Sequence, residues 1–148
     1  MLGVFEGHQG AVNSLSQCGD YLVSGSWDTT AKIWDIATRT CIKTLEGHTH
    51  SVAVLFVNPS FIITASIDKN IYFWENGVKT KTITGAHSDG IRHLDIDKNL
   101  GFLTASNDET AKLWTLTGDS LNTFKGHDSY VYWFHKKNLI NFYLIKLN

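Results

Sequence analysis

The chain reads Leu22-Val23-Ser24-Gly25-Ser26-Trp27-Asp28-Thr29-Thr30-Ala31-Lys32-Ile33-Trp34 near its beginning, and this stretch returns twice, at 62–74 and at 102–114. The aspartates at its centre are spaced by about 40 residues, and so are the tryptophans that close it. A period in this range predicts a repeat architecture, in which each unit buries its apolar surface against its neighbours.

A second landmark opens each unit. Gly-His pairs occur at Gly7-His8, Gly47-His48 and Gly126-His127, and Ala86-His87 takes the third place. These landmarks divide the chain into units of about 7–46, 47–85 and 86–125, a partial unit at 126–134 and an atypical tail at 135–148. We therefore expect one repeat domain over residues 1–134.

Composition narrows the class of protein. The 148 residues carry a formal net charge of −1 and are 43% hydrophobic, which is typical of a globular protein. With no large Lys/Arg cluster we expect no nucleic-acid partner, and with no apolar run near the roughly 20 residues that span a bilayer we expect no membrane segment. Cys18 and Cys41 lie far apart, which favours reduced thiols and a cytoplasmic or nuclear location.

Each unit contains four short segments with the period-two alternation of β-strands, and no segment shows helical periodicity. Turn residues such as Gly19-Asp20, Asp28-Thr29 and Asn76-Gly77 separate them, because Gly, Asn and Asp tolerate turn angles. The predicted strands are 11–15, 21–24, 31–34 and 41–45; 52–57, 61–65, 71–74 and 79–83; and 91–96, 102–105, 111–114 and 121–124.

This pattern resembles the WD-repeat β-propeller blade. The Trp-Asp dipeptide that names the family is present at Trp34-Asp35, whereas the other two units have Glu75 and Thr115 after the tryptophan. The resemblance implies an all-β fold of about three complete four-stranded blades with partial ends. Leu2–Phe5 resembles the last strand of a preceding blade. Because a closed ring takes roughly four to eight blades, we expect an incomplete propeller with open edges that favour pairing with other chains.

The resemblance also implies a buried hydrogen-bonded quartet in each blade, made of the Gly-His histidine, a Ser or Thr, the turn aspartate and the closing tryptophan. The chemistry is consistent, because a tryptophan only donates, a carboxylate only accepts, and a hydroxyl and an imidazole can bridge them. The predicted quartets are His8, Ser24, Asp28 and Trp34; His48, Thr64, Asp68 and Trp74; and His87, Thr104, Asp108 and Trp114.

His, Ser and Asp together are also the groups of a hydrolase triad. An active site is normally built once, however, whereas this set recurs in every unit, so we interpret it as structural and expect no enzyme and no cofactor. The seven histidines form no ligand-spaced pair with the two cysteines, so we expect no metal site.

A narrower resemblance lies in the run 24–34, the His-Ser-Asp-Gly-Ile-Arg-His run at 87–93 and the stretch 126–132. These stretches are similar to the propeller of the phospholipase A2-activating protein family. That resemblance implies a scaffold that binds ubiquitin or ubiquitinated proteins in ubiquitin-dependent degradation, beside a hexameric AAA ATPase, valosin-containing protein. The family carries ubiquitin- and ATPase-binding modules C-terminal to the propeller as well, so we expect no ATPase binding from these residues, and ubiquitin binding would rest on the propeller alone. A generic WD scaffold of another complex is the alternative.

By the same resemblance, the loops before the first strand and between the second and third strands share one rim, the usual partner surface. An exposed Trp, Tyr or Arg is typical of binding hot spots. The expected partner-binding residues are Asn13, Trp27, Ile67, Arg92, Asn107, Tyr130 and Tyr132.

The tail departs from the repeat. From Lys136 to Asn148 it contains only Lys, Asn and apolar residues and lacks every landmark. We interpret it as translated non-coding or frame-shifted sequence at the end of a truncated chain; a real terminal strand or helix is the alternative.

Overall fold

The computed structural model describes residues 3–58, 60–97, 101–131, 133–136 and 142–145, and all regular secondary structure in this part of the chain is β. The strands form three four-stranded antiparallel sheets and one hairpin, each with neighbouring strands in chain order. They are β1 Val12–Cys18, β2 Tyr21–Ser26, β3 Ala31–Asp35, β4 Cys41–Leu45, β5 Val52–Asn58, β6 Phe61–Ser66, β7 Ile71–Glu75, β8 Val78–Ile83, β9 Ile91–Asp97, β10 Gly101–Ser106, β11 Ala111–Trp114, β12 Ser120–Phe124, β13 Trp133–Lys136 and β14 Phe142–Ile145.

The predicted fold class is confirmed, because each of the three repeat units forms one four-stranded sheet, which we call blades 1, 2 and 3. Strand bounds differ from the sequence prediction by a few residues, as where β1 begins at Val12 instead of Ala11. The strand expected over Leu2–Phe5 is wrong for residues 3–5, which form no strand, and Leu2 lies outside the described residues. The last strand of a preceding blade would pair with the third strand of that same blade. The described residues contain no such third strand, because each of the three sheets is already complete with its own four strands.

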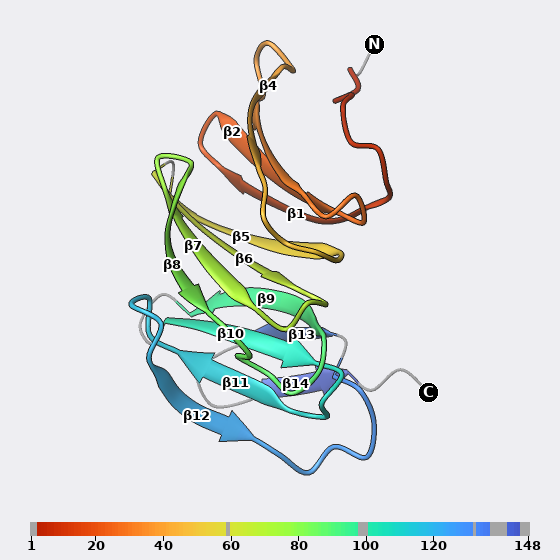
Figure 1. Ribbon diagram of the computed structural model, residues 1–148, viewed down its shortest axis with the longest axis vertical. Coiled ribbons are helices and arrows are strands. Elements are labelled where there is room, and N and C mark those ends of the chain that lie inside the picture. Colours follow the sequence, from red (N-terminus) through yellow and green to blue (C-terminus); the bar gives the residue numbers. More distant parts are fainter. Residues whose placement is uncertain (1–2, 59, 98–100, 132, 137–141, 146–148) are drawn as a thin grey trace.

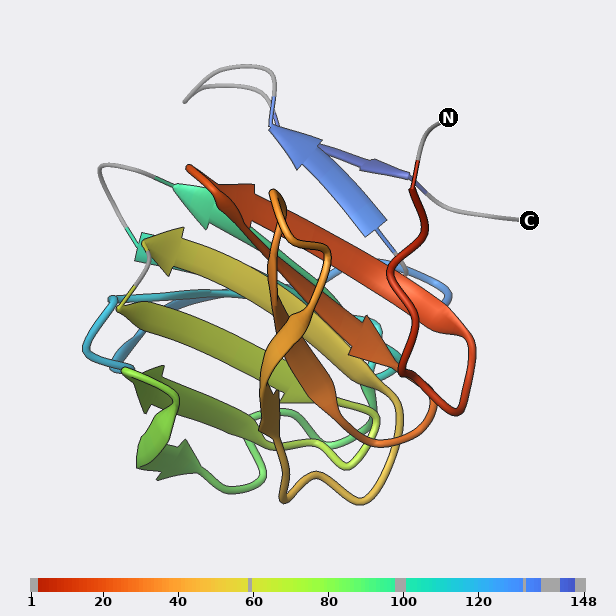
Figure 2. The ribbon, with the colours of Figure 1, turned by 90° about the horizontal axis from the view of Figure 1, so that it is seen from above.

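The blades fan outward from their first strands. β1 contacts β5, and β5 contacts β9, whereas the fourth strands β4, β8 and β12 point away from one another (Figure 1). Viewed along the stack, the first strands of successive blades run in similar directions (Figure 2). This is the arrangement of neighbouring blades in a propeller, but it covers an arc and leaves the ring open.

Blade 2 is apolar on both faces, and blades 1 and 3 cover it from the two sides. In β6, Ile62 packs toward blade 1 and the next residue, Ile63, packs toward blade 3, as the period of two requires. The strand therefore reads as a continuous apolar run. The core between blades 1 and 2 is made of Val23, Ala31, Leu45, Val52, Ile62, Tyr72 and Trp74, and that between blades 2 and 3 of Ile63, Ala65, Ile71, Phe73, Ala86, Ile91, Leu94, Phe102 and Trp114.

The loop between the second and third strands has the same form in every blade. Four residues lie between the strand bounds, and a bond from the N–H of Ser26, Ser66 or Ser106 to the carbonyl four residues later leaves three of them as the loop itself. The residue after the turn aspartate is left-handed, with φ of 71° at Thr29, 74° at Lys69 and 65° at Glu109. This matches the three-residue hairpin loop in which a type I turn is followed by a left-handed residue. The sequence analysis expected the aspartate to adopt the unusual turn angles. In the structure it is the residue after the aspartate that has a positive φ. The Asn76-Gly77 turn forms as predicted, with both residues left-handed.

Part of the atypical tail is described. β13 and β14 pair as an antiparallel hairpin, with Trp133 opposite Ile145, and β13 lies against β9 where the first strand of a fourth blade is expected. Val131 covers Leu103 and Leu113 on the far face of blade 3. The stretches 137–141 and 146–148 lie outside the described residues.

Replacing Thr29 by glycine should stabilise the protein. A β-branched side chain disfavours the left-handed region by about 1–2 kcal/mol, part of which the greater freedom of glycine in the unfolded chain offsets. We expect a gain of about 0.5–1 kcal/mol in the free energy of unfolding, measured by urea denaturation. The matched control is Thr30→Gly in the same loop, which should destabilise because the Thr30 hydroxyl donates to Asp28 at 2.7 Å. A lower midpoint for Thr29→Gly would contradict the strained turn.

Candidate functional site

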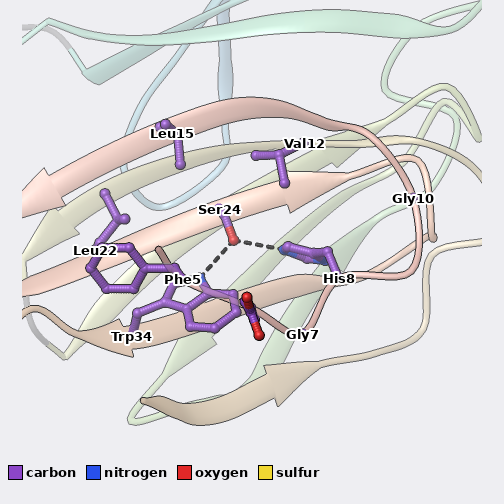
Figure 3. Close-up of a pocket in the computed structure, with 10 residues that line it drawn as sticks. Phe5, Gly7, His8, Gly10, Val12, Leu15, Leu22, Ser24 and Trp34 are labelled. Carbon is purple, nitrogen blue, oxygen red and sulfur yellow. Dashed lines mark hydrogen bonds between the residues drawn. The ribbon is translucent and has the colours of Figure 1, made fainter. Parts of the chain in front are cut away.

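The four residues expected to form a quartet in blade 1 are joined by short hydrogen bonds. The indole Nε1 of Trp34 donates to Ser24 Oγ at 2.7 Å, and that oxygen lies 2.7 Å from His8 Nε2. His8 Nδ1 in turn lies 2.7 Å from Asp28 Oδ2. Figure 3 shows Ser24 between His8 and Trp34, with β2 and β3 carrying the hydroxyl and the indole.

The other two blades repeat this geometry. In blade 2, Thr64 Oγ1 is 2.9 Å from both Trp74 Nε1 and His48 Nε2, and His48 Nδ1 is 2.8 Å from Asp68. In blade 3 the corresponding distances are 2.9 Å from Thr104 to Trp114, 2.7 Å from Thr104 to His87 and 2.8 Å from His87 to Asp108. The structure thus brings together all twelve residues of the predicted quartets.

The tryptophan N–H can only donate and the carboxylate can only accept, so each hydroxyl accepts from the indole and each His Nδ1–H donates to its aspartate. Where the imidazole is neutral, the hydroxyl donates to its Nε2. Burial lowers the pKa of His87 below its ordinary value even though Asp108 acts in the opposite direction, which favours the neutral form in blade 3.

The aspartate carboxylate fastens two loops to each other. Asp28 Oδ2 accepts the backbone N–H of Gln9 at 2.9 Å, and Asp28 Oδ1 accepts the backbone N–H of Thr30 at 3.0 Å. Burial by itself would raise the pKa of Asp28, but the hydrogen bonds from Thr30, Gln9 and His8 hold it well below its ordinary value. The loop before the first strand and the loop after the second are therefore held in a fixed relation.

A further serine in each blade belongs to this bracing and was not assigned a role from the sequence. Ser26 Oγ donates to the Gly10 carbonyl at 3.1 Å and accepts the Asp28 N–H at 3.1 Å. Ser66 and Ser106 make the same two contacts in their own blades. The signal was present, because these serines recur with the same period as the aspartates.

Blade 2 differs from the other two at one position of the turn. Thr30 and Thr110 donate a hydroxyl to the aspartate, at 2.7 and 2.6 Å, whereas Asn70 occupies that place in blade 2. The side-chain oxygen of Asn70 instead accepts the N–H of Gly85 at 3.0 Å, which ties the turn to the end of the blade. The carboxylate of Asp68 consequently receives fewer bonds than those of Asp28 and Asp108.

The order hydroxyl, imidazole, carboxylate is also that of a hydrolase triad, but the hydroxyls are inaccessible. Ser24 is 2% exposed, and Thr64 and Thr104 are fully buried. Each of these oxygens already receives a tryptophan N–H, and a nucleophile has to meet a substrate carbon. The geometry fits bracing of the blade.

The fourth Gly-His pair has no such quartet in the described part of the chain. The buried Nε2 of His127 has no hydrogen-bond partner among the described residues. In blades 1 to 3 that nitrogen meets the Ser or Thr of the second strand. His127 therefore marks the start of a fourth unit whose bracing is not assembled in the described residues.

The predicted rim residues occupy the edge that the quartets brace. Trp27, Ile67 and Asn107 each begin the turn between second and third strands, and their backbone N–H groups bond to the segment before the first strand of the same blade. The Trp27 side chain is 67% exposed and Tyr130 is exposed as well. Tyr132 lies outside the described residues.

The remaining rim residues make contacts between blades and within one blade. Asn13 Nδ2 donates to Ser51 Oγ at 2.7 Å, which links blade 1 to blade 2. Ile67 packs closely on Gly90, at the start of blade 3. Arg92 Nε donates to Asn107 Oδ1 at 2.8 Å within blade 3. The rim is thus one continuous, braced edge, although partner binding by these residues stays a prediction.

The described residues contain no cluster of three or more His, Cys, Asp or Glu side chains that could hold a metal ion. They also contain no helix long and apolar enough to cross a membrane.

Comparison with known proteins gives consistent results. The "WD domain, G-beta repeat" family matches residues 1–35, 39–75 and 77–115. Protein DOA1 of Saccharomyces cerevisiae, an ortholog of phospholipase A2-activating protein, is 42% identical over 130 residues, which is 85% of this chain and 18% of DOA1. Nuclear distribution protein PAC1 of Candida dubliniensis is 40% identical over 117 residues, 72% of this chain and 24% of PAC1. This chain therefore spans less than a quarter of the length of each.

A solved structure shares the fold. The WD40 beta propeller domain of Doa1 has a TM-score of 0.81 and 40% sequence identity, over 88% of this chain and 45% of that one. Repeated four-stranded blades with buried His, Ser or Thr, Asp and Trp quartets define a β-propeller repeat protein. More narrowly, the chain belongs to the WD-repeat family, and its resemblance to the phospholipase A2-activating protein family is borne out by DOA1.

Removing one bridging hydroxyl should destabilise the whole arc. Thr64→Val keeps the shape of the side chain but leaves Trp74 Nε1 and His48 Nε2 buried without a partner. We expect a loss of about 1–3 kcal/mol in the free energy of unfolding, measured by urea denaturation. The control is Thr82→Val on the exposed face of β8, which should change little. Equal effects of the two variants would contradict the bracing role.

Acid should weaken the blade 3 bracing in a defined pH window. Burial tends to raise the pKa of Asp108, but hydrogen bonds from Thr110 and the nearby His87 bring it to about 2. Because this folded-state pKa lies below the ordinary 3.8, the contribution is complete above about pH 4 and is lost toward about pH 2. The difference in urea midpoint between the wild type and Asp108→Asn should therefore shrink below about pH 4. Asp20→Asn controls for net charge, and a difference that stays constant would contradict the linkage.

Proposed function

We propose that this chain is a non-catalytic protein-interaction scaffold that binds ubiquitin, or ubiquitinated proteins, through the rim of its blades in ubiquitin-dependent protein degradation. The sequence similarity to DOA1 over 85% of the chain supports the scaffold and the pathway. Within these 148 residues, we propose ubiquitin binding and no ATPase binding. We propose the cytoplasm or the nucleus as the location of the protein.

The observation that carries the proposal is the exposure of Trp27. The Trp27 side chain is large, apolar and 67% exposed, so a partner can bury it. Because the turn that carries it is rigid, binding does not have to order the backbone of this loop. The turn is rigid because Asp28, the next residue, holds the Gln9 and Thr30 backbone amides. Blades 2 and 3 have Ile67 and Asn107 at this position, so the aromatic anchor is particular to blade 1.

The rest of the rim suits a protein partner. Arg92 is exposed and held in orientation by Asn107, and Tyr130 lies near the turn of blade 3 because the Val131 N–H bonds to the Ser106 carbonyl at 2.9 Å. Trp, Tyr and Arg are the residue types that dominate binding energy at protein interfaces. Their polar neighbours supply hydrogen-bonding groups around the apolar anchor.

A generic WD scaffold of another complex is the second candidate, because the chain is also 40% identical to a nuclear distribution protein over 117 residues. The two candidates use the same rim and differ in what binds there. Under the second candidate, ubiquitin shows no interaction while a pull-down returns one unrelated assembly.

Trp27→Ala should weaken ubiquitin binding without unfolding the chain. Isotope-labelled ubiquitin is titrated with the wild type and the variant, and we expect the dissociation constant to rise about tenfold or more, as for a hot-spot residue. Ile42→Ala, which truncates an exposed side chain on β4, is the matched control and should bind like the wild type. No chemical-shift change in ubiquitin with the wild-type chain would reject ubiquitin as the partner, and unchanged affinity of Trp27→Ala would reject Trp27.

A further inference from the structure

The turn between the third and fourth strands is shorter in blade 2 than in its neighbours. Only Asn76 and Gly77 lie between β7 and β8, whereas residues 36–40 and 115–119 connect the corresponding strands of blades 1 and 3. Successive turns of an antiparallel sheet alternate between its two edges, so these turns lie at the edge opposite the rim. In Figure 1 the β7–β8 and β11–β12 turns lie on the left and the rim lies on the right.

The longer turn of blade 3 packs on blade 2. A Cβ on Gly118 would lie 3.0 Å from Phe73 Cζ and 3.1 Å from Ile83 Cδ1, so the backbone of the turn lies directly on these side chains. Beside them, the rings of Phe61 and Phe73 are 6.0 Å apart, and Phe73 is only 2% exposed. The turn therefore covers the apolar surface at the junction of blades 2 and 3.

The same turn also binds a lysine of blade 2. Lys81 Nζ donates to the Thr117 carbonyl at 2.5 Å. Hydrogen bonds from the hydroxyls of Thr117 and Thr115 lower the pKa of Asp119, and the nearby Lys81 ammonium adds to this effect. The turn of blade 3 thus presents a carbonyl and a carboxylate to Lys81.

The corresponding junction between blades 1 and 2 has a groove of about 350 Å³. Tyr21 and Ile33 have the strand positions that Phe61 and Phe73 have in blade 2, and both are partly exposed. The described residues that line the groove are Tyr21, Ile33, Ile42, Lys43, Asn76 and Gly77. The short turn of blade 2 therefore leaves open a surface that the longer turn of blade 3 covers on the next blade.

Lys43 is the equivalent of Lys81. Lys43 lies opposite Ile33 on β3, and Lys81 lies opposite Phe73 on β7. The Lys43 ammonium has no hydrogen-bond or carboxylate partner within the described part of the chain, and it is the only charged group among the described residues that line the groove. The groove thus combines an apolar wall with one unpaired positive charge.

We propose that this groove binds a turn of a partner protein that carries an aliphatic side chain and a carboxylate. The aliphatic side chain packs on Tyr21, Ile33 and Ile42, because burial of apolar surface favours association. The carboxylate pairs with Lys43. The groove and the rim lie at opposite edges of the blades, so this partner is distinct from the ubiquitin proposed at the rim, and both can be bound at once.

The probe is a cyclic peptide with the sequence of residues 113–121, which contains the turn that covers the next blade. It is titrated into the isotope-labelled 148-residue chain, and we expect saturable amide shifts at Ile33, Ile42 and Gly77. Lys43→Met keeps most of the methylene stem and should raise the dissociation constant roughly two- to fivefold, as for an exposed ion pair. Lys125→Met removes the same charge from an exposed lysine beyond blade 3 and should bind like the wild type.

Two further comparisons test the carboxylate and the groove separately. A peptide with Asn in place of Asp119 should bind more weakly to the wild type, and Lys43→Met should not weaken it further, because the two changes remove the same ion pair. Replacing Asn76-Gly77 by Thr-Leu-Thr-Gly-Asp, the turn sequence of blade 3, places the chain's own turn in the groove. The amide shifts should then disappear.

The proposal is overturned if the peptide causes no shifts at millimolar concentration, or shifts only residues outside the groove. It is also overturned if Lys43→Met binds the Asp119 peptide as tightly as the wild type does, or if binding survives the longer turn. These titrations contain no ubiquitin, so their failure would leave the proposed ubiquitin contact of the rim untouched, and failure of that contact would leave the groove to be judged on its own.

Discussion

One buried hydroxyl in each blade joins the third strand to the loop before the first strand. Ser24, Thr64 and Thr104 each receive a tryptophan N–H from the third strand and bond a histidine from the loop before the first strand. A buried polar group without such a partner costs about 1–3 kcal/mol, so the second and third strands and two loops are held in one geometry. The sheet and its rim are therefore a single mechanical unit.

This bracing explains how a surface made of loops can recognise a partner. Loops carry binding residues in many folds because a rigid scaffold positions them. In this protein the loops themselves are fixed by hydrogen bonds. The aspartate of each turn accepts backbone N–H groups from its own turn and from the loop before the first strand. The residues next to that aspartate can then vary between blades, from Trp27 to Ile67 to Asn107, without changing the turn. Different side chains at the same position of each turn can therefore give a repeated sheet a specific binding surface.

Much of the fold could be predicted from the sequence because its signals recur. The period of about 40 residues, the turn aspartates and the tryptophans placed all twelve strands of blades 1 to 3 within a few residues. Features that depend on spatial neighbours were less predictable. No pattern in residues 2–5 showed that a strand there would lack a partner, and Ser26 became meaningful only when its bonds to Gly10 and Asp28 were seen.

The bracing role of the quartets is tested most directly by the imidazole nitrogen shifts of His87 in an isotope-labelled sample. We expect a neutral ring at neutral pH with its proton on Nδ1, because burial lowers the pKa of His87, Nδ1 faces Asp108 and Nε2 faces the Thr104 hydroxyl. A ring protonated on Nε2 alone, or charged with protons on both nitrogens, would contradict this bracing.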